Sequence, residues 1–246
     1  MLTPRQVVRS RGLTLTLSCE NWITHYRWQT YNSKEPETLD WIDDRIGGSD
    51  LVFDIGANVG VYAIYAALRH PGVRVVAFEP EYANLSLLRD NVVANHLQER
   101  IEVYSVALSD HVGVSRLHLQ DLTPGAALHT ESKARLCMTA AQRPVVWREG
   151  IYAMTLDRFC EETGLRPNGI KLDVDGTESQ VLEGALRALS SPALRSIMIE
   201  LPADAQARER CTDRLTAAGL RRAWSDPLAK SLNELWVREG SNGRGF

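Results

Sequence analysis

Short apolar runs alternate with amphipathic segments along most of the chain. Runs typical of buried strands occur at 50–55, 73–79 and 100–108. Between them, residues 59–70 and 81–96 carry apolar positions three and four apart, which predicts two helices. The order of strand, helix, strand, helix and strand is typical of a parallel sheet with helices on both faces.

The same alternation returns in the second half of the chain. Helices are predicted at 155–164, 177–189 and 203–219. Apolar runs predict further strands at 168–174, 195–201, 220–225 and 233–239. With the first three runs, these make seven strands in an α/β fold.

Residues 120–149 interrupt this rhythm with a stretch that has no sustained period. Connections of this length often act as lids or binding loops, and a variable insertion or an extra hairpin is the alternative. Ahead of the alternation, residues 13–18 alternate in polarity and residues 35–48 have helical spacing. We expect residues 1–50 to form a cap on the substrate side of one domain, residues 51–246, that carries the insert at 120–149.

The composition narrows the class of protein. The 246 residues are 44% hydrophobic and 24% charged, as in ordinary globular proteins. A formal net charge of −3 gives no pull toward nucleic acid, whose binders usually carry a basic face. The four cysteines never form a CxxC pair, so neither a zinc site nor a redox motif is indicated. Because no signal-peptide core and no run near the roughly 18 apolar residues of a membrane span is found, we expect a cytoplasmic enzyme or binding protein.

Chemistry begins where the first predicted strand ends. Asp54 precedes a turn with Gly56 and Gly60, residues that let backbone approach a ligand and let the next helix pack closely. Ligands of open parallel sheets bind outside the carboxyl ends of the strands. A phosphate-binding GxGxxG loop would avoid a carboxylate, whereas Asp54 would attract an ammonium group. The alternative is a carboxylate that only caps the turn.

The second and third strand ends extend this pattern. Glu79 follows the second strand, where a carboxylate is suited to accept hydrogen bonds from both hydroxyls of a ribose. Asp54 and Glu79 together predict a nucleoside with a cationic amino-acid portion and no phosphate, which describes S-adenosylmethionine. Ser109, Asp110 or the backbone amides after the third strand could reach an adenine edge, although the same residues make a good turn.

The fourth strand leads into Asp173, Asp175 and Glu178. Glu178 suits the first turn of the next helix, where the helix dipole favours an acid. Asp173 and Asp175 lie two apart, which places them on the same face of an extended chain. Two carboxylates in one pocket raise the pKa of one of them, which suits a general base. A magnesium or calcium site is the rival interpretation.

Five motifs in this order resemble the FkbM family of S-adenosylmethionine-dependent methyltransferases: FDIGANVGVYA, VVAFEPEYANLSLLRDNV, VALSDHVG, TLDRFC and IKLDVDGTESQVLEGA. The resemblance covers residues 35–201. It implies a Rossmann-like, seven-stranded class I methyltransferase sheet with the last strand antiparallel beside the fifth. It also implies, mostly, O-methylation of hydroxyls on sugars, glycolipids or natural products. Asp175 stands where the family usually has the longer glutamate.

The resemblance also implies roles for single residues. The turn after the first strand would line the methionine portion of the cofactor, Glu79 the ribose, and residues 107–109 the adenine, while Asp173 would lie nearest the methyl group. The predicted cofactor-binding set is Asp54, Gly56, Ala57, Asn58, Gly60, Glu79, Pro80, Asn84, Ala107, Leu108, Ser109 and Asp173.

The predicted reaction is an in-line displacement, for which the protein must hold a hydroxyl oxygen at roughly 3 Å from the methyl carbon and exclude water. Asp173 or Asp175 would accept the proton of the hydroxyl. The other candidate catalytic residues are Lys171, Glu178, His129 and Glu200. No metal is included in this set.

Two other functions stay open at this point. One is a non-catalytic cofactor-binding or partner-binding protein of the same fold. The other is an NAD-dependent dehydrogenase, which the lack of a GxGxxG motif and of a Tyr-x-x-x-Lys pair disfavours. Methylation of nucleic-acid amines is disfavoured too, because no Asn-Pro-Pro-aromatic motif is present. The expected partner is a small-molecule or glycan acceptor, and its identity and the oligomeric state are left open.

Overall fold

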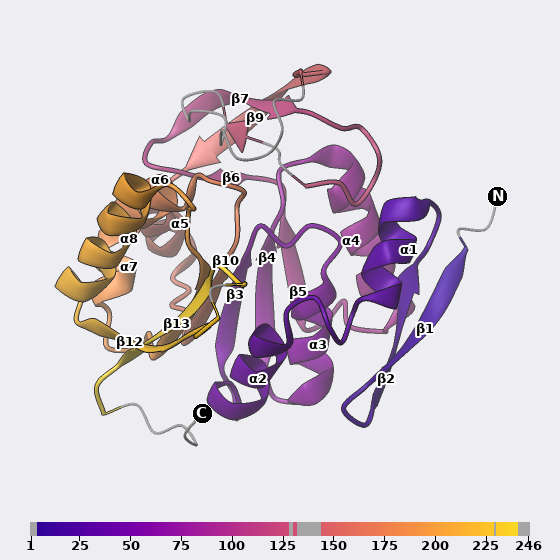
Figure 1. The fold of residues 1–246 in the computed structure, drawn as a ribbon, viewed down its shortest axis with the longest axis horizontal. Coiled ribbons are helices and arrows are strands. Elements are labelled where there is room, and N and C mark those ends of the chain that lie inside the picture. Colours follow the sequence, from indigo (N-terminus) through magenta and orange to yellow (C-terminus); the bar gives the residue numbers. More distant parts are fainter. Residues whose placement is uncertain (1–3, 128–129, 132–143, 229, 241–246) are drawn as a thin grey trace.

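The computed structural model describes residues 4–127, 130–131, 144–228 and 230–240. A seven-stranded sheet stands at its centre (Figure 1). In spatial order its strands are β12 (Leu220–Ser225), β13 (Asn233–Arg238), β11 (Ser196–Glu200), β10 (Gly169–Leu172), β3 (Leu51–Ile55), β4 (Arg74–Phe78) and β5 (Ile101–Tyr104). β13 is antiparallel to both of its neighbours, and the other pairs are parallel. The seven predicted strands are confirmed, with the last one antiparallel beside the fifth.

Helices cover both faces of this sheet. One face packs against α2 (Pro36–Arg45), α3 (Val61–Arg69) and α4 (Tyr82–Ala94). The other packs against α5 (Leu156–Thr163), α6 (Glu178–Glu183), α7 (Leu186–Ser190) and α8 (Ala205–Ala217). Successive residues of a strand point to opposite faces, so Val52 belongs to the first apolar core and Phe53 to the second.

The N-terminal residues form an appendage to the first face. A hairpin of β1 (Arg5–Ser10) and β2 (Leu13–Ser18) is followed by α1 (Trp22–Gln29). Asn91 of α4 and Asn95, the residue that follows α4, hold the hairpin: the Ser18 N–H donates to Asn91 Oδ1 at 2.7 Å and the Thr16 N–H donates to Asn95 Oδ1 at 2.8 Å. Of these elements the sequence indicated only the alternating segment 13–18 and the helix within 35–48.

A second sheet lies across the end of the main sheet (Figure 1). Its order is β6 (Ala107–Leu108), β9 (Trp147–Met154), β7 (Gly113–Leu119) and β8 (Thr130–Glu131). β7 and β9 are antiparallel and lie at the two ends of residues 120–149, so the insert connects the two strands. The binding-loop and extra-hairpin interpretations of the insert stay predictions. His129, one of the predicted helpers, lies outside the described residues.

Two predicted elements are divided in the structure. The run 100–108 was expected to be one strand, but β5 ends at Tyr104 and the chain passes to the second sheet as β6. The helix expected at 177–189 is two helices, because α6 ends at Glu183 and is followed by Gly184, where a Cβ would overlap the carbonyl oxygen of Ser109 next to β6. In both places a contact with the second sheet overrides the local pattern.

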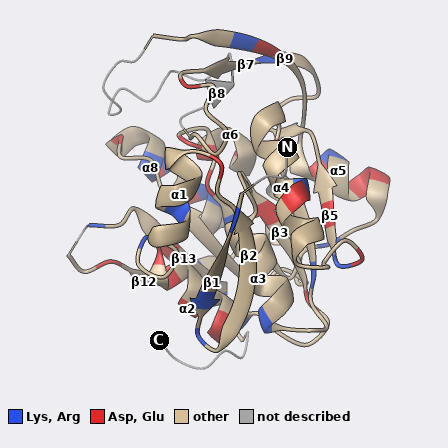
Figure 2. Cartoon of the chain, turned by 90° about the vertical axis from the view of Figure 1, so that its right-hand side faces the viewer, with Lys and Arg blue, Asp and Glu red and all other residues tan. Residues whose placement is uncertain are grey.

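Charge of both signs is spread over the described elements. Figure 2 shows acidic and basic segments interspersed along the ribbon. Among the described helices the longest have 13 residues, and none is long and apolar enough to span a bilayer.

Candidate active site

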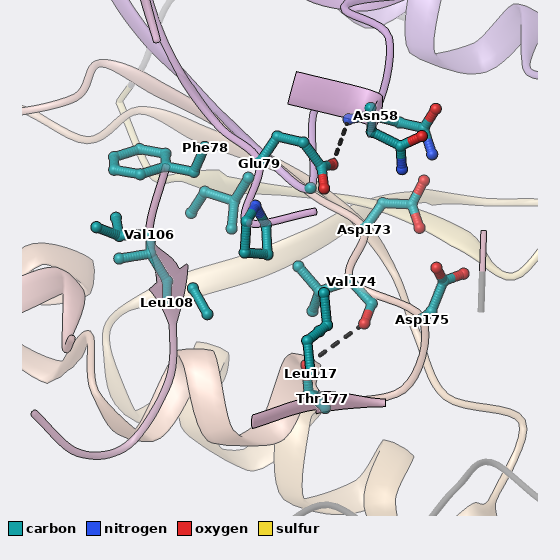
Figure 3. Close-up of a pocket in the computed structure, with 15 residues that line it drawn as sticks. Asn58, Phe78, Glu79, Val106, Leu108, Leu117, Asp173, Val174, Asp175 and Thr177 are labelled. Atoms are coloured by element: carbon teal, nitrogen blue, oxygen red, sulfur yellow. Dashed lines mark hydrogen bonds between the residues drawn. The ribbon is translucent and has the colours of Figure 1, made fainter. Parts of the chain in front are cut away.

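A cavity opens at the carboxyl ends of β3, β4 and β10. Strand order reverses between β3 and β10, which is where open α/β sheets bind their ligands. Figure 3 shows Phe78, Val106 and Leu108 on one side of the cavity and Asp173 and Asp175 on the other. The cavity therefore has an apolar end and an acidic end.

The loop after β3 passes directly beside the end of β10. Gly56 has a φ of +81°, and a Cβ there would overlap the carbonyl oxygen of Asp173. The N–H groups of Gly56 and Ala57 donate to the carbonyl oxygen of Phe78 at 3.1 and 3.0 Å. Only glycine fits at position 56, because this loop is packed between two strand ends.

Glu79 is a buried carboxylate on the cavity wall and is 5% exposed. Its Oε2 accepts the Asn58 N–H at 2.8 Å and its Oε1 accepts the Glu81 N–H at 2.9 Å (Figure 3). Burial raises its pKa to about 8, even though these two hydrogen bonds oppose the shift. Each carboxylate oxygen can accept a second hydrogen bond, so Glu79 can still bind the hydroxyls of a ligand.

Two asparagines of the cavity wall hold a loop of the insert in place. Asn58 and Asn84 donate through Nδ2 to the carbonyl oxygen of Ala126 at 2.8 and 3.1 Å. The Gly125 N–H donates to Asn84 Oδ1 at 2.7 Å. Arg27 of α1 donates through Nε and Nη2 to the Gly125 carbonyl oxygen at 2.9 and 2.8 Å.

We refer to residues 124–126 as the clamped loop. Asn21, the residue that caps α1, also binds this loop, through a 2.9 Å hydrogen bond to the Pro124 carbonyl oxygen. The loop thus joins the N-terminal appendage to the cavity wall. Asn84, predicted as a cofactor ligand, has its amide oxygen and nitrogen engaged by the clamped loop.

Asp54 lies beneath α3. Its Oδ2 accepts the Ala63 N–H at 3.1 Å in the first turn of that helix, while its buried Oδ1 has no partner among the described residues. Burial raises the pKa of Asp54 to about 6, against the effect of the nearby Lys171 ammonium. Asp54 therefore caps α3, and its contact with a cofactor ammonium stays a prediction.

Lys171 is the register partner of Asp54 on β10 and is 4% exposed. Its Nζ donates to Asp173 Oδ2 at 3.1 Å and lies 5.1 Å from the centre of the Tyr62 ring. Burial alone would lower the pKa of Lys171, but the carboxylates of Asp173, Asp54 and Glu35 outweigh it and raise that pKa. Lys171 is therefore a fixed positive charge rather than a proton acceptor.

Asp173 and Glu200 form a hydrogen-bonded carboxyl pair at the ends of β10 and β11. Burial opposes the ionisation of Asp173, but the cations Lys171 and Lys34 hold its pKa below the usual range. The Asp173 charge, with burial, raises the pKa of Glu200 to about 8. Near neutral pH the pair therefore shares one proton, which resides on Glu200.

Asp173 and Asp175 do not lie on an extended chain, which corrects the expected geometry. β10 ends at Leu172, and Asp175 has a left-handed backbone with a φ of +57°. Both carboxylates nevertheless point to the same side of the cavity (Figure 3). Aspartate tolerates this backbone conformation better than most residues.

Glu178 supports this turn from below. Its Oε1 accepts the N–H groups of Val174 and Gly176 at 3.2 and 3.0 Å, and burial raises its pKa to about 7. It lies outside the cavity walls. Glu178 therefore stabilises the turn that carries Asp173 and Asp175.

A second cavity adjoins the first. The two share Gly56, Asn58, Asp173 and Asp175. The second cavity is lined further by Arg27, Lys34, Glu35, Tyr62, Lys171 and Glu200. Charged side chains thus surround the acidic end of the first cavity.

The structure brings most of the predicted site residues to these walls. Those on the walls are Gly56, Ala57, Asn58, Glu79, Pro80, Asn84, Ala107, Leu108, Lys171, Asp173, Asp175 and Glu200. Asp54, Gly60, Ser109 and Glu178 lie behind the walls: Gly60, for example, is required because a Cβ would overlap the Leu88 side chain of α4. The roles assigned to all of these residues stay predictions.

Sequence reasoning missed Arg27, Lys34, Glu35 and Tyr62. Glu35 lies just before α2, is 6% exposed, and pairs with Lys34 at 2.6 Å and with the Tyr62 hydroxyl. No motif marks these residues, because the fold alone brings the start of α2 against α3. Within the described ranges, no group of three or more His, Cys, Asp or Glu side chains is arranged to hold a metal ion.

The sheet order and the position of the cavity define the class I fold of S-adenosylmethionine-dependent methyltransferases. The model of the methyltransferase FkbM domain matches residues 54–215, and the chain belongs to this family. It is 32% identical over 172 residues to the 31-O-demethyl-FK506 methyltransferase FkbM of Streptomyces tacrolimicus. That match covers 62% of this chain and 65% of the relative, just under two thirds of its length.

Two solved structures show the same fold. The methyltransferase FkbM of Methylobacillus flagellatus KT superposes with a TM-score of 0.53 at 19% identity, over 78% of this chain and 44% of that one. The fibrillarin of Aeropyrum pernix, solved with bound S-adenosyl-L-methionine, superposes with a TM-score of 0.51 at 12% identity, over 95% of this chain and 82% of that one.

Proposed function

We propose that the protein transfers the methyl group of S-adenosylmethionine to a hydroxyl of a sugar, glycolipid or natural product. One observation carries this proposal: a buried ribose-type carboxylate, Glu79, and a proton-sharing pair, Asp173 and Glu200, stand at opposite ends of adjoining cavities. Family membership supports methyl transfer, and the names of the relatives do not fix the acceptor.

The walls of the first cavity fit this cofactor. Pro80, Val106, Leu108 and Leu117 offer an apolar slot for an adenine ring beside Glu79, which would accept hydrogen bonds from the ribose. No phosphate-binding glycine loop is present, and the acidic end would repel a pyrophosphate. These features favour the methyl donor over NAD.

The methionine portion would extend past Gly56 and Asn58 toward the acidic end. The Oδ1 atom of Asn58 is buried without a partner among the described residues. It could therefore accept a hydrogen bond from a ligand group such as an ammonium. S-adenosylmethionine, when bound, supplies an electrophilic methyl group. The residues around it have to orient the acceptor and exclude water.

The proton of the acceptor hydroxyl would pass to the carboxyl pair. Asp173 is kept ionised by Lys171, so it can accept a hydrogen bond from the hydroxyl. The new bond between oxygen and the methyl carbon would form as the carbon–sulfur bond breaks, with S-adenosylhomocysteine as the leaving group. The O–H bond would break in the same step, and its proton would move to the Asp173 carboxylate. Glu178 acts through the turn and is a positioning residue in this scheme.

Calorimetric titration tests the cofactor assignment. The native protein should bind S-adenosylhomocysteine and not NAD. Glu79→Gln should weaken binding of S-adenosylhomocysteine by at least about tenfold, because its NH2 group would face one of the two N–H donors that now bind Glu79, and an unsatisfied buried donor costs about 1–3 kcal/mol. Glu99→Gln, an exposed acid, serves as the control. Tight binding of NAD without binding of S-adenosylhomocysteine would overturn the proposal.

A further inference from the structure

The second cavity is not needed to hold the adenosine in the scheme above. It opens from the acidic end, and the elements that complete it are α1, the segment before α2, α3, β10 and β11. The question is which chemical class of ligand its walls would accept.

Each cation on these walls already has a partner. Arg27 donates to the Gly125 carbonyl oxygen, Lys34 pairs with Glu35 at 2.6 Å, and Lys171 pairs with Asp173 at 3.1 Å. An incoming anion would have to compete with these pairs. Phosphate recognition instead relies on cations that point at the ligand.

The charges on the walls also balance. Three acidic side chains of the walls, Glu35, Asp173 and Asp175, are matched in number by three basic ones, Arg27, Lys34 and Lys171. Glu200 adds no charge near neutral pH, because its neighbour Asp173 keeps it protonated. A phosphorylated or an amino-bearing ligand would leave one charge uncompensated in a partly buried site, which is costly.

The same walls are rich in groups that bind hydroxyls. Carboxylate oxygens can accept more than one hydrogen bond each, while the protonated Glu200 and the ammonium of Lys34 can donate. Val61, Ala57 and Ala127 are the aliphatic side chains among the described lining residues, so little apolar surface is offered. A hydrophobic body would leave these polar groups without partners.

We propose that the second cavity binds the reacting part of the acceptor as an electrically neutral, polyhydroxylated ring, and that Glu35 and Lys34 set this preference against phosphorylated and amino-bearing analogues. This inference rests on the proposed methyl-transfer function. It adds that the reacting part of the acceptor is electrically neutral, and that Glu35 and Lys34 determine this specificity.

The test is ligand-observed NMR on the full chain, saturated with S-adenosylhomocysteine. The probes are a panel of hexoses, pentoses and cyclitols, each beside its monophosphate and its amino counterpart. At least one neutral probe should bind, with both of its charged counterparts at least tenfold weaker. Binding of a phosphorylated or amino probe in preference to every neutral one, or binding of no neutral probe, overturns the inference.

Two variants change the net charge of the cavity walls in opposite directions. Lys34→Gln leaves excess negative charge and should strengthen the amino probe relative to the neutral one by about tenfold. Glu35→Gln leaves excess positive charge and should strengthen the phosphorylated probe in the same way. Glu20→Gln and Lys230→Gln, at exposed positions, are the matched controls and should change neither ratio. Unchanged ratios in both wall variants would remove Glu35 and Lys34 from the specificity role.

The failure of this inference can be told apart from failure of the proposed function. If S-adenosylhomocysteine does not bind, the methyl-transfer proposal fails first. If it binds but displaces the neutral probe, the second cavity belongs to the cofactor and only the acceptor inference fails. Because Lys34 is about half exposed, its variant is expected to fold even if Glu35→Gln does not.

Discussion

At the scale of single residues, Asp173 is the proposed proton acceptor. Replacing it with asparagine keeps the shape but removes the charge that would accept the hydroxyl proton. Turnover should fall by about 10²–10⁴-fold, the usual contribution of a general base, while affinity for S-adenosylhomocysteine changes little.

The measurement needs labelled methyl transfer to an identified acceptor, with Asp213→Asn at an exposed position as the control. Thermal unfolding of the variant checks that loss of the Lys171 pairing has not unfolded the chain. Turnover equal to that of the native protein would remove Asp173 from the base role.

Glu200 predicts a pH dependence. Its pKa is raised to about 8 by Asp173 and by burial, so below that pH the carboxyl pair carries one proton and is a weaker base. Turnover should therefore rise as the pH increases through about 8 and level off above it. In Glu200→Gln, which cannot lose that proton, this rise should disappear. A native profile that is flat between pH 6 and 9 contradicts the assignment.

Residue types and positions in the site could be read from the sequence, whereas the direction of the side chains could not. Asp54 and Glu178 were expected in the site from their places after strands. In the structure Asp54 caps α3 and Glu178 supports the turn after β10, because both carboxylates meet backbone N–H groups first. Which N–H groups a buried acid meets depends on packing between elements, which a linear pattern does not contain.

At the scale of elements, the clamped loop links the N-terminal appendage to the cofactor cavity. Asn84→Ala would remove two hydrogen bonds and leave the Gly125 N–H unpaired, while the Ala126 carbonyl oxygen would keep only its hydrogen bond from Asn58. Each hydrogen bond contributes about 0.5–1.5 kcal/mol, so S-adenosylhomocysteine should bind at least about fivefold more weakly.

Asn84→Asp offers a conservative rescue, because it keeps the acceptor for Gly125 and loses only the donor to Ala126. Its affinity should fall between those of the native protein and Asn84→Ala. Hydrogen exchange of the Gly125 amide should speed up in the same order. Asn32→Ala, at an exposed position, is the control, and equal affinities of all variants would separate the clamp from cofactor binding.

Periodicity predicted the elements that face the main core and missed those that face the appendage and the second sheet. The strand run 100–108 reads as one piece because Val106 to Leu108 are apolar, yet those residues pair with β9 or line the cavity. Likewise α1 has only one buried residue, Thr24, so it lacks the apolar stripe on which a helix prediction depends.

At the scale of the whole molecule, an aromatic cluster joins the sheet to the helices of its second face. Phe159 of α5 is 2% exposed and meets the rings of Phe53, Phe78 and Tyr104 edge to face, with centroids 5.7, 4.8 and 4.8 Å away. Phe159→Ala should lower the free energy of unfolding by about 3–5 kcal/mol.

Urea unfolding measures this loss. Val114→Ala is the matched control, since that side chain is 88% exposed and its truncation should change stability by less than about 0.5 kcal/mol. A loss below about 1 kcal/mol in Phe159→Ala would show that the cluster does not hold the helix layer to the sheet.

The order of the seven strands could be predicted because strand and helix alternate and because the motifs resemble one family. The second cavity could not, since its walls come from α1, the start of α2 and the ends of two strands far apart in sequence. Lys34 and Glu35, for example, reach Asp173 only after α2 packs on α3.

Because the chain passes directly from β5 of the main sheet into β6 of the second sheet, both sheets contribute residues to the apolar side of the cofactor cavity. Val106, Ala107 and Leu108 line the cavity, and Leu117 of β7 joins them. A ligand held there bridges two sheets that the chain itself connects by only two residues. Thermodynamic linkage then requires the ligand to stabilise the second sheet by the same free energy that an ordered second sheet contributes to binding. A change that disorders the second sheet should therefore weaken ligand binding, even where the changed residue lies far from the reacting atoms.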